Sequence, residues 1–281
     1  MRFIFFGTPS FSARTFEALI EHGLTPIAVV CNPDRPIGRK KVLTPPPVKT
    51  IAQRYSNIEI LQPEKLDEDF VRKLTSLNAD FFLVFAYNQI FRKNILAIPR
   101  LGTIGVHPSF LPKYRGASPF QTAILNGDSE TGVTLYLLDE GIDSGPIIAR
   151  SAPVKISDED NFNSLAEKLA DASTEILIKT IPDLVAGRIT PEPQDKSKVS
   201  YTKKFTTEDG FIKEEDLKNA ESYTREAKEI LRKINAFNPE PGAWTMKDGK
   251  RMKLLKAKIE NQKLVLTKIQ IEGEKPRELT K

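Results

Sequence analysis

TIGVHPSFLPKYRGASP, residues 103–119, is the stretch that decides the fold and points to the chemistry. The segment up to His107 has the composition of a short buried strand, and Pro108 and Pro112 forbid a helix directly after it. His107 is therefore predicted at the carboxyl end of a strand. In open α/β sheets the loops at that end hold the reactive groups, so the position predicts a site as well as a fold.

The segment LDEGIDSG, residues 138–145, supplies a carboxylate that can reach this histidine. A carboxylate against one imidazole nitrogen fixes the tautomer of the ring and favours its protonated form, which suits general acid–base chemistry near neutral pH. We therefore predict His107 and Asp143 as a catalytic pair. His22, the only other histidine, precedes Gly23 at a predicted helix end, and we expect it to be structural.

Apolar runs of strand length alternate with amphipathic helices from RFIFFG (2–7) to TGVTLYLLD (131–139). This alternation predicts an α/β fold with a doubly wound, mostly parallel sheet whose last strands run antiparallel at an edge. The glycine turn after the first strand is not a GxGxxG motif, so we predict no dinucleotide site there.

Polar, proline-bearing sequence divides the chain into two predicted domains. A first domain spans residues 1–188, a linker spans 189–206, and a C-terminal domain spans 207–281. In the last of these, one amphipathic helix is expected over 214–237, followed by short alternating strands that suggest a small barrel or hairpin sheet.

The composition of the 281-residue chain is that of an ordinary globular protein. A single cysteine excludes an internal disulfide, and two histidines give no zinc-site spacing, so no metal is expected. The first apolar run is too short for the core of a signal peptide, and no run is long enough to span a membrane, so we expect a cytoplasmic protein. A net charge of +5 permits a nucleic-acid partner without requiring one.

HPSFLPKYRGASP (107–119) followed by TGVTLYLLDEGIDSGPII (131–148) resembles the folate-dependent formyltransferases. RFIFFGTPSFSARTFEAL (2–19), NPDRPIGRKKVLTPPPVK (32–49) and AFNPEPGAW (236–244) resemble, within that family, the group that formylates methionyl initiator tRNA. The resemblance implies a Rossmann-like formyltransferase domain, an OB-like C-terminal barrel that binds tRNA, and 10-formyltetrahydrofolate as the formyl donor for translation initiation. The short connection ENQ predicts that the barrel is reduced. We expect the chain to act as a monomer.

The resemblance also implies roles for individual residues. His107 would meet the developing oxyanion or relay protons, while Asp143 would hold the imidazole. Folate contacts would fall on the loop that follows, at Ser109, Phe110, Leu111 and Pro112. The loop after the second strand would enter the tRNA acceptor stem through Arg39, Lys40 and Lys41, although a disordered basic surface loop also explains these charges.

One position departs from the family pattern. The family has an asparagine two residues before the histidine as an oxyanion donor, and this chain has Gly105 there. Asn88 ends a strand that we expect beside TIGVH, and we hypothesise that its amide replaces the missing donor across the gap at Gly105. An ordinary turn residue is the alternative for Asn88.

Two other functions stay open at the level of sequence. A formyltransferase with another amine acceptor, such as an amino sugar nucleotide or glycinamide ribonucleotide, would share the donor site. A catalytically silent tRNA-binding relative would explain Gly105, although His107 and Asp143 argue against it.

Overall fold

The computed structural model describes residues 1–38, 40–220 and 224–279. They form two compact units, and each unit draws on several parts of the chain. Unit 1 comprises Met1–Arg115, Gly132–Pro153 and Glu167–Ser200, and unit 2 comprises Gly116–Thr131, Val154–Ala166 and Tyr201–Lys281. The predicted domain boundaries are positions along a continuous chain, whereas these units interleave, so the boundaries stay a prediction.

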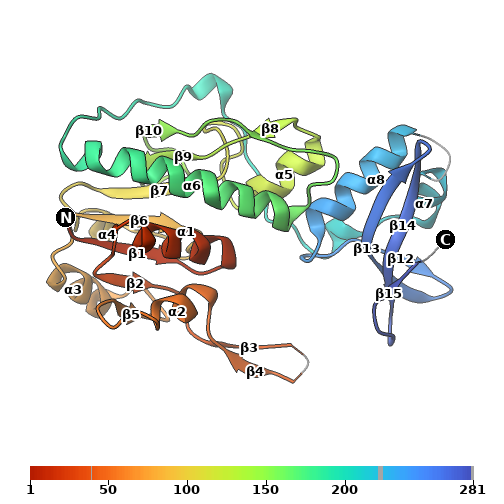
Figure 1. The fold of residues 1–281 in the computed structure, drawn as a ribbon, viewed down its shortest axis with the longest axis horizontal. Coiled ribbons are helices and arrows are strands. Elements are labelled where there is room, and N and C mark those ends of the chain that lie inside the picture. Colours follow the sequence, from red (N-terminus) through yellow and green to blue (C-terminus); the bar gives the residue numbers. More distant parts are fainter. Residues whose placement is uncertain (39, 221–223, 280–281) are drawn as a thin grey trace. The chain divides into compact units, whose positions relative to one another are not determined.

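Unit 1 is built on a seven-stranded sheet with the order β10-β9-β7-β6-β1-β2-β5 (Figure 1). The strands from β5 to β7 are parallel neighbours, whereas β9 and β10 run antiparallel at one edge. This confirms the predicted mostly parallel sheet with an antiparallel edge. In chain order the strands are β1 (Phe3–Gly7), β2 (Ala28–Val30), β5 (Glu59–Leu61), β6 (Phe81–Phe85), β7 (Thr103–His107), β9 (Thr134–Leu137) and β10 (Ile147–Arg150).

Helices cover both faces of this sheet because successive residues of the buried strands point to opposite sides. On one side the ring of Phe5 packs against Phe16 of α1, with ring centroids 5.2 Å apart. On the other side the cluster that contains Ile4 and Phe6 also contains Leu74 of α3 and Ile95 of α4. The helices that belong wholly or mostly to unit 1 are α1 (Ser10–Glu21), α2 (Pro47–Ala52), α3 (Glu68–Ser76), α4 (Lys93–Leu96) and α6 (Phe162–Val185).

The basic segment after β2 is a hairpin rather than the flexible loop that its composition suggests. Strands β3 (Arg35–Ile37) and β4 (Val42–Thr44) pair antiparallel, with Arg35 opposite Thr44. Gly38 and Lys41 both have positive φ, at 73° and 48°, and such angles close a short turn at low cost only where glycine or a tolerant residue stands.

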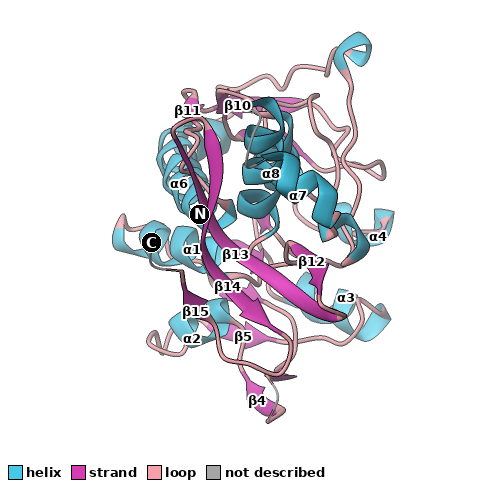
Figure 2. Cartoon of the chain, turned by 90° about the vertical axis from the view of Figure 1, so that its right-hand side faces the viewer, coloured by secondary structure: helices cyan, strands magenta, loops and turns pink. Residues whose placement is uncertain are grey.

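Unit 2 contains a four-stranded antiparallel sheet in the order β12-β13-β14-β15, which is a reduced version of the expected barrel. Figure 2 shows β13 and β14 as a long twisted ribbon. Helix α8 buries Ala227, Leu231 and Ile234 in the same core as the buried side of these strands. The strands are β12 (Trp244–Lys247), β13 (Lys250–Glu260), β14 (Lys263–Ile271) and β15 (Arg277–Glu278), and β8 (Glu130–Thr131) pairs with β11 (Val154–Lys155) as a separate ribbon.

The helix expected over residues 214–237 is described in two parts, α7 (Glu214–Ala220) and α8 (Thr224–Phe237), and residues 221–223 lie outside the described range. Helix α5 (Pro119–Asn126) also belongs to unit 2. The short 3₁₀ turns are η1 (Lys196–Lys198) in unit 1 and η2 (Glu208–Gly210) in unit 2. Within the described residues, the helices are all too short or too polar to cross a bilayer.

Candidate functional site

His107 is the last residue of β7 and lies opposite Thr134 of β9. Its side chain is buried, with 5% of the residue exposed. The ring nitrogen Nε2 lies 2.8 Å from the carbonyl oxygen of Tyr114. Because a carbonyl only accepts hydrogen bonds, this contact requires a proton on Nε2.

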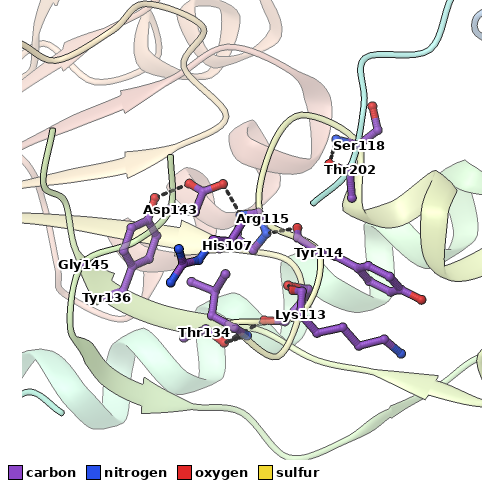
Figure 3. A network of polar contacts seen from close by, with 12 residues as sticks. His107, Lys113, Tyr114, Arg115, Ser118, Thr134, Tyr136, Asp143, Gly145 and Thr202 are labelled. Carbon is purple, nitrogen blue, oxygen red and sulfur yellow. Dashed lines mark hydrogen bonds and ion pairs between the residues drawn. The ribbon is translucent and has the colours of Figure 1, made fainter. Parts of the chain in front are cut away.

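Asp143 comes within reach of His107 from the loop that joins β9 to β10. The Oδ2 atom of Asp143 lies 3.5 Å from Nδ1 of His107, in ion-pair contact (Figure 3). The structure therefore brings the two predicted catalytic residues together. Both ring nitrogens face oxygen atoms, so a ring protonated on both nitrogens can donate to both.

The loop that carries Asp143 is shaped by its own polar and glycine residues. Asp139 accepts hydrogen bonds from the backbone N–H of Gly141 and from the hydroxyl of Ser144. A Cβ atom at Gly145 would lie 1.8 Å from the carbonyl oxygen of Leu137, so only glycine lets the chain return this close to β9. These constraints explain why the DEGIDSG pattern presents Asp143, at φ 47°, toward β7.

Tyr136 of β9 is a site residue that the sequence analysis missed. Its hydroxyl donates a 2.6 Å hydrogen bond to Oδ1 of Asp143, the carboxylate oxygen that does not face His107 (Figure 3). Burial raises the pKa of this hydroxyl well above its ordinary value of 10, and the negative charge of Asp143 raises it further. Tyr136 is therefore a neutral donor at physiological pH.

Arg115 and Gln194 hold the backbone of the same loop. The guanidinium of Arg115 donates two hydrogen bonds to Oε1 of Gln194, at 3.1 and 2.7 Å. The Nε2 amide of Gln194 donates in turn to the carbonyl oxygens of Asp143 and Gly145, both at 2.8 Å. Gln194 lies in the segment expected to be a linker, where no motif marks it, whereas Arg115 stands in the YRG run next to His107.

The loop predicted to contact folate is held rigidly beside His107. The hydroxyl of Thr134 donates to the carbonyl oxygen of Ser109 and accepts from the backbone N–H of Leu111, at 2.7 and 3.0 Å. Ser109, Leu111 and Pro112 are buried, and Phe110 is partly exposed. Contact between this loop and folate stays a prediction, and the burial means that it would use backbone atoms and the ring of Phe110.

Two of the three residues predicted to bind tRNA, Lys40 and Lys41, lie at the turn of the β3–β4 hairpin. Lys40 and Lys41 are exposed, and Arg39 lies outside the described residues. Across the described part of the chain, no hydrogen bond or ion pair joins Lys40 or Lys41 to His107 or Asp143. A role for these residues stays a prediction.

Asn88 lies past the end of β6, and its side chain is exposed. Strands β6 and β7 are neighbours as expected, with Val84 opposite Gly105. The hypothesis for Asn88 assumed a gap beside Gly105, but a Cβ there would lie 2.4 Å from both Tyr136 and Leu138 side chains. That space is filled, and the role of Asn88 stays an untested prediction.

The described residues of the site do not form a metal-binding group. Across residues 1–38, 40–220 and 224–279, no three His, Cys, Asp or Glu side chains gather closely enough to bind one. The polar groups around His107 are instead paired with one another.

Comparison with known proteins identifies the family. Residues 1–181 match the family model described as Formyl transferase, and residues 221–268 match Formyl transferase, C-terminal domain. The methionyl-tRNA formyltransferase of Halorhodospira halophila is 42% identical over 242 residues, which are 86% of this chain and 74% of that protein.

Solved structures share the fold at lower identity. The methionyl-tRNA formyltransferase from Clostridium thermocellum matches with a TM-score of 0.63 and 19% identity, over 96% of this chain and 98% of that one. The N-formyltransferase from Helicobacter canadensis, in complex with folinic acid and dTDP-3-aminofucose, matches with a TM-score of 0.65 and 19% identity, over 92% and 88%. The chain belongs to the formyl transferase family.

Proposed function

We propose that this chain transfers the formyl group of 10-formyltetrahydrofolate to the amino group of methionyl initiator tRNA, in the cytoplasm, for translation initiation. The observation that carries the proposal is the His107–Asp143 contact at the end of β7, in a chain 42% identical to a methionyl-tRNA formyltransferase. The folinic acid bound to the Helicobacter canadensis enzyme supports a folate as the formyl donor.

The proposed reaction moves one acyl group between two nitrogens. The neutral amine attacks the formyl carbon, and the formyl oxygen becomes an oxyanion. The bond to the folate nitrogen then breaks, while a proton passes from the attacking amine to that leaving nitrogen. No nucleophilic serine or cysteine is needed, and the protein contributes positioning, oxyanion stabilisation and a proton path.

His107 is the group that serves the oxyanion or the proton path in this proposal. Its Nδ1 faces the carboxylate of Asp143, whereas its Nε2 faces the neutral carbonyl of Tyr114. Hydrogen bonds to neutral groups are weaker than charge-assisted ones, so Nε2 is the nitrogen that exchanges its carbonyl partner for the substrate while the ring stays in place. Asp143 keeps the ring oriented and stabilises the positive charge that develops on the ring as a proton passes through it.

The acceptor is tested by comparing amines under the same conditions. Formyl transfer from 10-formyltetrahydrofolate is measured with methionyl initiator tRNA, free methionine, an amino sugar nucleotide and glycinamide ribonucleotide. We expect transfer to the charged tRNA alone. Transfer to one of the small amines instead would assign that acceptor, and tRNA binding without any transfer would identify a silent relative.

The same assay tests the site residues. His107→Ala is expected to lower kcat/KM by about a hundred- to ten-thousandfold, the contribution typical of general acid–base groups. His22→Ala is the matched control, because His22 is the other histidine and is exposed. Asn88→Ala with unchanged turnover would exclude a role for Asn88, and His107→Ala with wild-type turnover would exclude the proposed mechanism.

A further inference from the structure

Gly105 and Tyr136 face each other across β7 and β9. A Cβ atom at Gly105 would lie 2.4 Å from Cε1 and 2.6 Å from Cζ of the Tyr136 ring. The ring therefore occupies the volume that a side chain at position 105 would need. His107 lies on the same side of β7 as Gly105, since alternate residues of a strand share a face, so the Tyr136 ring lies beside the histidine, with ring centroids 6.5 Å apart.

The hydroxyl of Tyr136 reaches the carboxylate that serves His107. It donates to Oδ1 of Asp143 at 2.6 Å, while Oδ2 faces Nδ1 of His107 at 3.5 Å. Each carboxylate oxygen thus has its own partner, and the two contacts together fix the plane of the carboxylate. The neighbouring Ile142 is 64% exposed, so packing of that side chain does little to hold this part of the loop.

The tyrosine is suited to this task by its stiffness and its protonation. Only 6% of Tyr136 is exposed, so the ring is fixed by its surroundings. Its pKa lies well above the ordinary value, first because of burial and then because of the charge on Asp143. A neutral phenol that donates to a carboxylate favours the ionised carboxylate, which is the form that can orient an imidazolium.

We propose that Tyr136 is a positioning residue of this site. Its hydroxyl holds the Asp143 carboxylate toward His107, and the lack of a side chain at Gly105 leaves room for the ring. The chemistry that Tyr136 supports rests on the proposed function. Tyr136 acts through Asp143 and is assigned no contact with the substrate.

Tyr136→Phe removes the hydroxyl and keeps the ring. We expect kcat to fall about 10- to 100-fold, as for the loss of a hydrogen bond to a charged group, with KM unchanged for both substrates. His107, Asp139 and Arg115, the other ionisable groups around this hydroxyl and carboxylate, are unchanged in the variant.

Tyr87→Phe is the matched control. Tyr87 is also buried, at 8% exposure, and packs among Phe6 and Phe91. Within the described part of the chain its hydroxyl has no hydrogen-bond partner, so its removal is expected to leave kcat unchanged. If the two phenylalanine variants behave alike, the proposal for Tyr136 is overturned.

A double-mutant comparison tests whether Tyr136 acts through Asp143. In an Asp143→Asn background the Tyr136→Phe change is expected to have no further effect on kcat, because the carboxylate that it positions is gone. An equal fold-loss in both backgrounds would overturn the proposal and indicate a general structural effect.

A spectroscopic measurement separates this inference from the choice of acceptor. The chain has only two histidines, so ¹⁵N-labelled histidine gives two rings to follow. Tyr136→Phe should change the ring resonances of His107 and leave those of His22 in place, whereas Tyr87→Phe should change neither. If methionyl-tRNA is not formylated, the proposed function fails while this measurement still decides the role of Tyr136, and unchanged His107 resonances overturn it.

Discussion

Gly105 lies on the same face of the sheet as His107. There is no room for a side chain at this position. The nearest atoms to a Cβ there belong to Tyr136 and Leu138. Leu138 has a flexible side chain that can move, whereas Tyr136 is buried and hydrogen-bonded to Asp143. The Tyr136 ring therefore uses the space that a side chain at position 105 would fill. From there its hydroxyl reaches Asp143.

Gly105→Ala is expected to destabilise the fold by about 1–3 kcal/mol, the usual cost of overpacking a core, and to lower kcat because the Tyr136 ring must shift. Chemical denaturation and formyl-transfer kinetics measure the two effects. In a Tyr136→Leu background the alanine should cost less stability, since the crowding ring is absent, while kcat stays low. If Gly105→Ala alone kept the stability and kcat of the wild type, a methyl group at position 105 would be shown to fit beside Tyr136 without displacing it.

Sequence could predict the contact between His107 and Asp143 because both residues stand in recognisable runs after predicted strands. It could not predict Tyr136, although the alternation of TLYL shows that Tyr136 has a fixed face. Only the register of β7 against β9 pairs Tyr136 with Gly105, and register depends on the whole edge of the sheet. Sequence could not predict the role of Gln194 for a similar reason, because an irregular segment has no periodicity from which its path can be predicted.

At the scale of elements, the basic segment after β2 forms the β3–β4 hairpin. Lys40 and Lys41 lie at a turn that joins two paired strands rather than on a free loop. Ile37, Val42 and Leu43 on the same hairpin are 59%, 60% and 66% exposed. Exposed apolar side chains next to lysines can combine apolar contacts to a nucleic acid with contacts to its phosphates, which fits the predicted tRNA contact.

The double variant Lys40→Ala/Lys41→Ala is therefore expected to raise KM for charged tRNA about tenfold or more, through the loss of one or two charge-assisted contacts. KM for the folate donor should not change. Steady-state kinetics with each substrate varied in turn measure both. The control is Lys65→Ala/Lys179→Ala, which removes the same charge from exposed positions outside the hairpin, and equal effects of the two double variants would refute a specific role for the hairpin.

The elements of the sheet were predictable where burial is strong. The runs that form β1, β6 and β7 are buried over their whole length and mostly apolar, as is typical of parallel strands covered on both faces. The hairpin was not predictable, because Pro36 and Pro45–Pro47 indicate extended or irregular chain and the strands are only three residues long.

On the scale of the whole molecule, positive charge is found on both compact units. Unit 1 carries the lysines at the β3–β4 turn, and unit 2 carries exposed lysines along β13, including Lys253 and Lys256. The ladder between β13 and β14 shifts register around Lys256, which returns Ala257 to the buried side after Met252 and Leu254. A bulge thus keeps the lysines on the exposed side of a strand that still contributes to the core.

If one tRNA contacts both units, and the two pairs of lysines share no partner, their contributions to binding should add. We expect Lys253→Ala/Lys256→Ala and Lys40→Ala/Lys41→Ala each to weaken tRNA binding, and each lost phosphate contact to reduce the slope of log K against log salt by about one. The quadruple variant should show the sum of both changes. Binding titrations between low and physiological salt measure this, with Lys65→Ala/Lys179→Ala as the control for net charge, since charge alone acts over the whole surface. An unchanged slope for the β13 pair would mean that unit 2 does not bind the tRNA backbone through this strand, and the hairpin of unit 1 would then carry the electrostatic recognition without it.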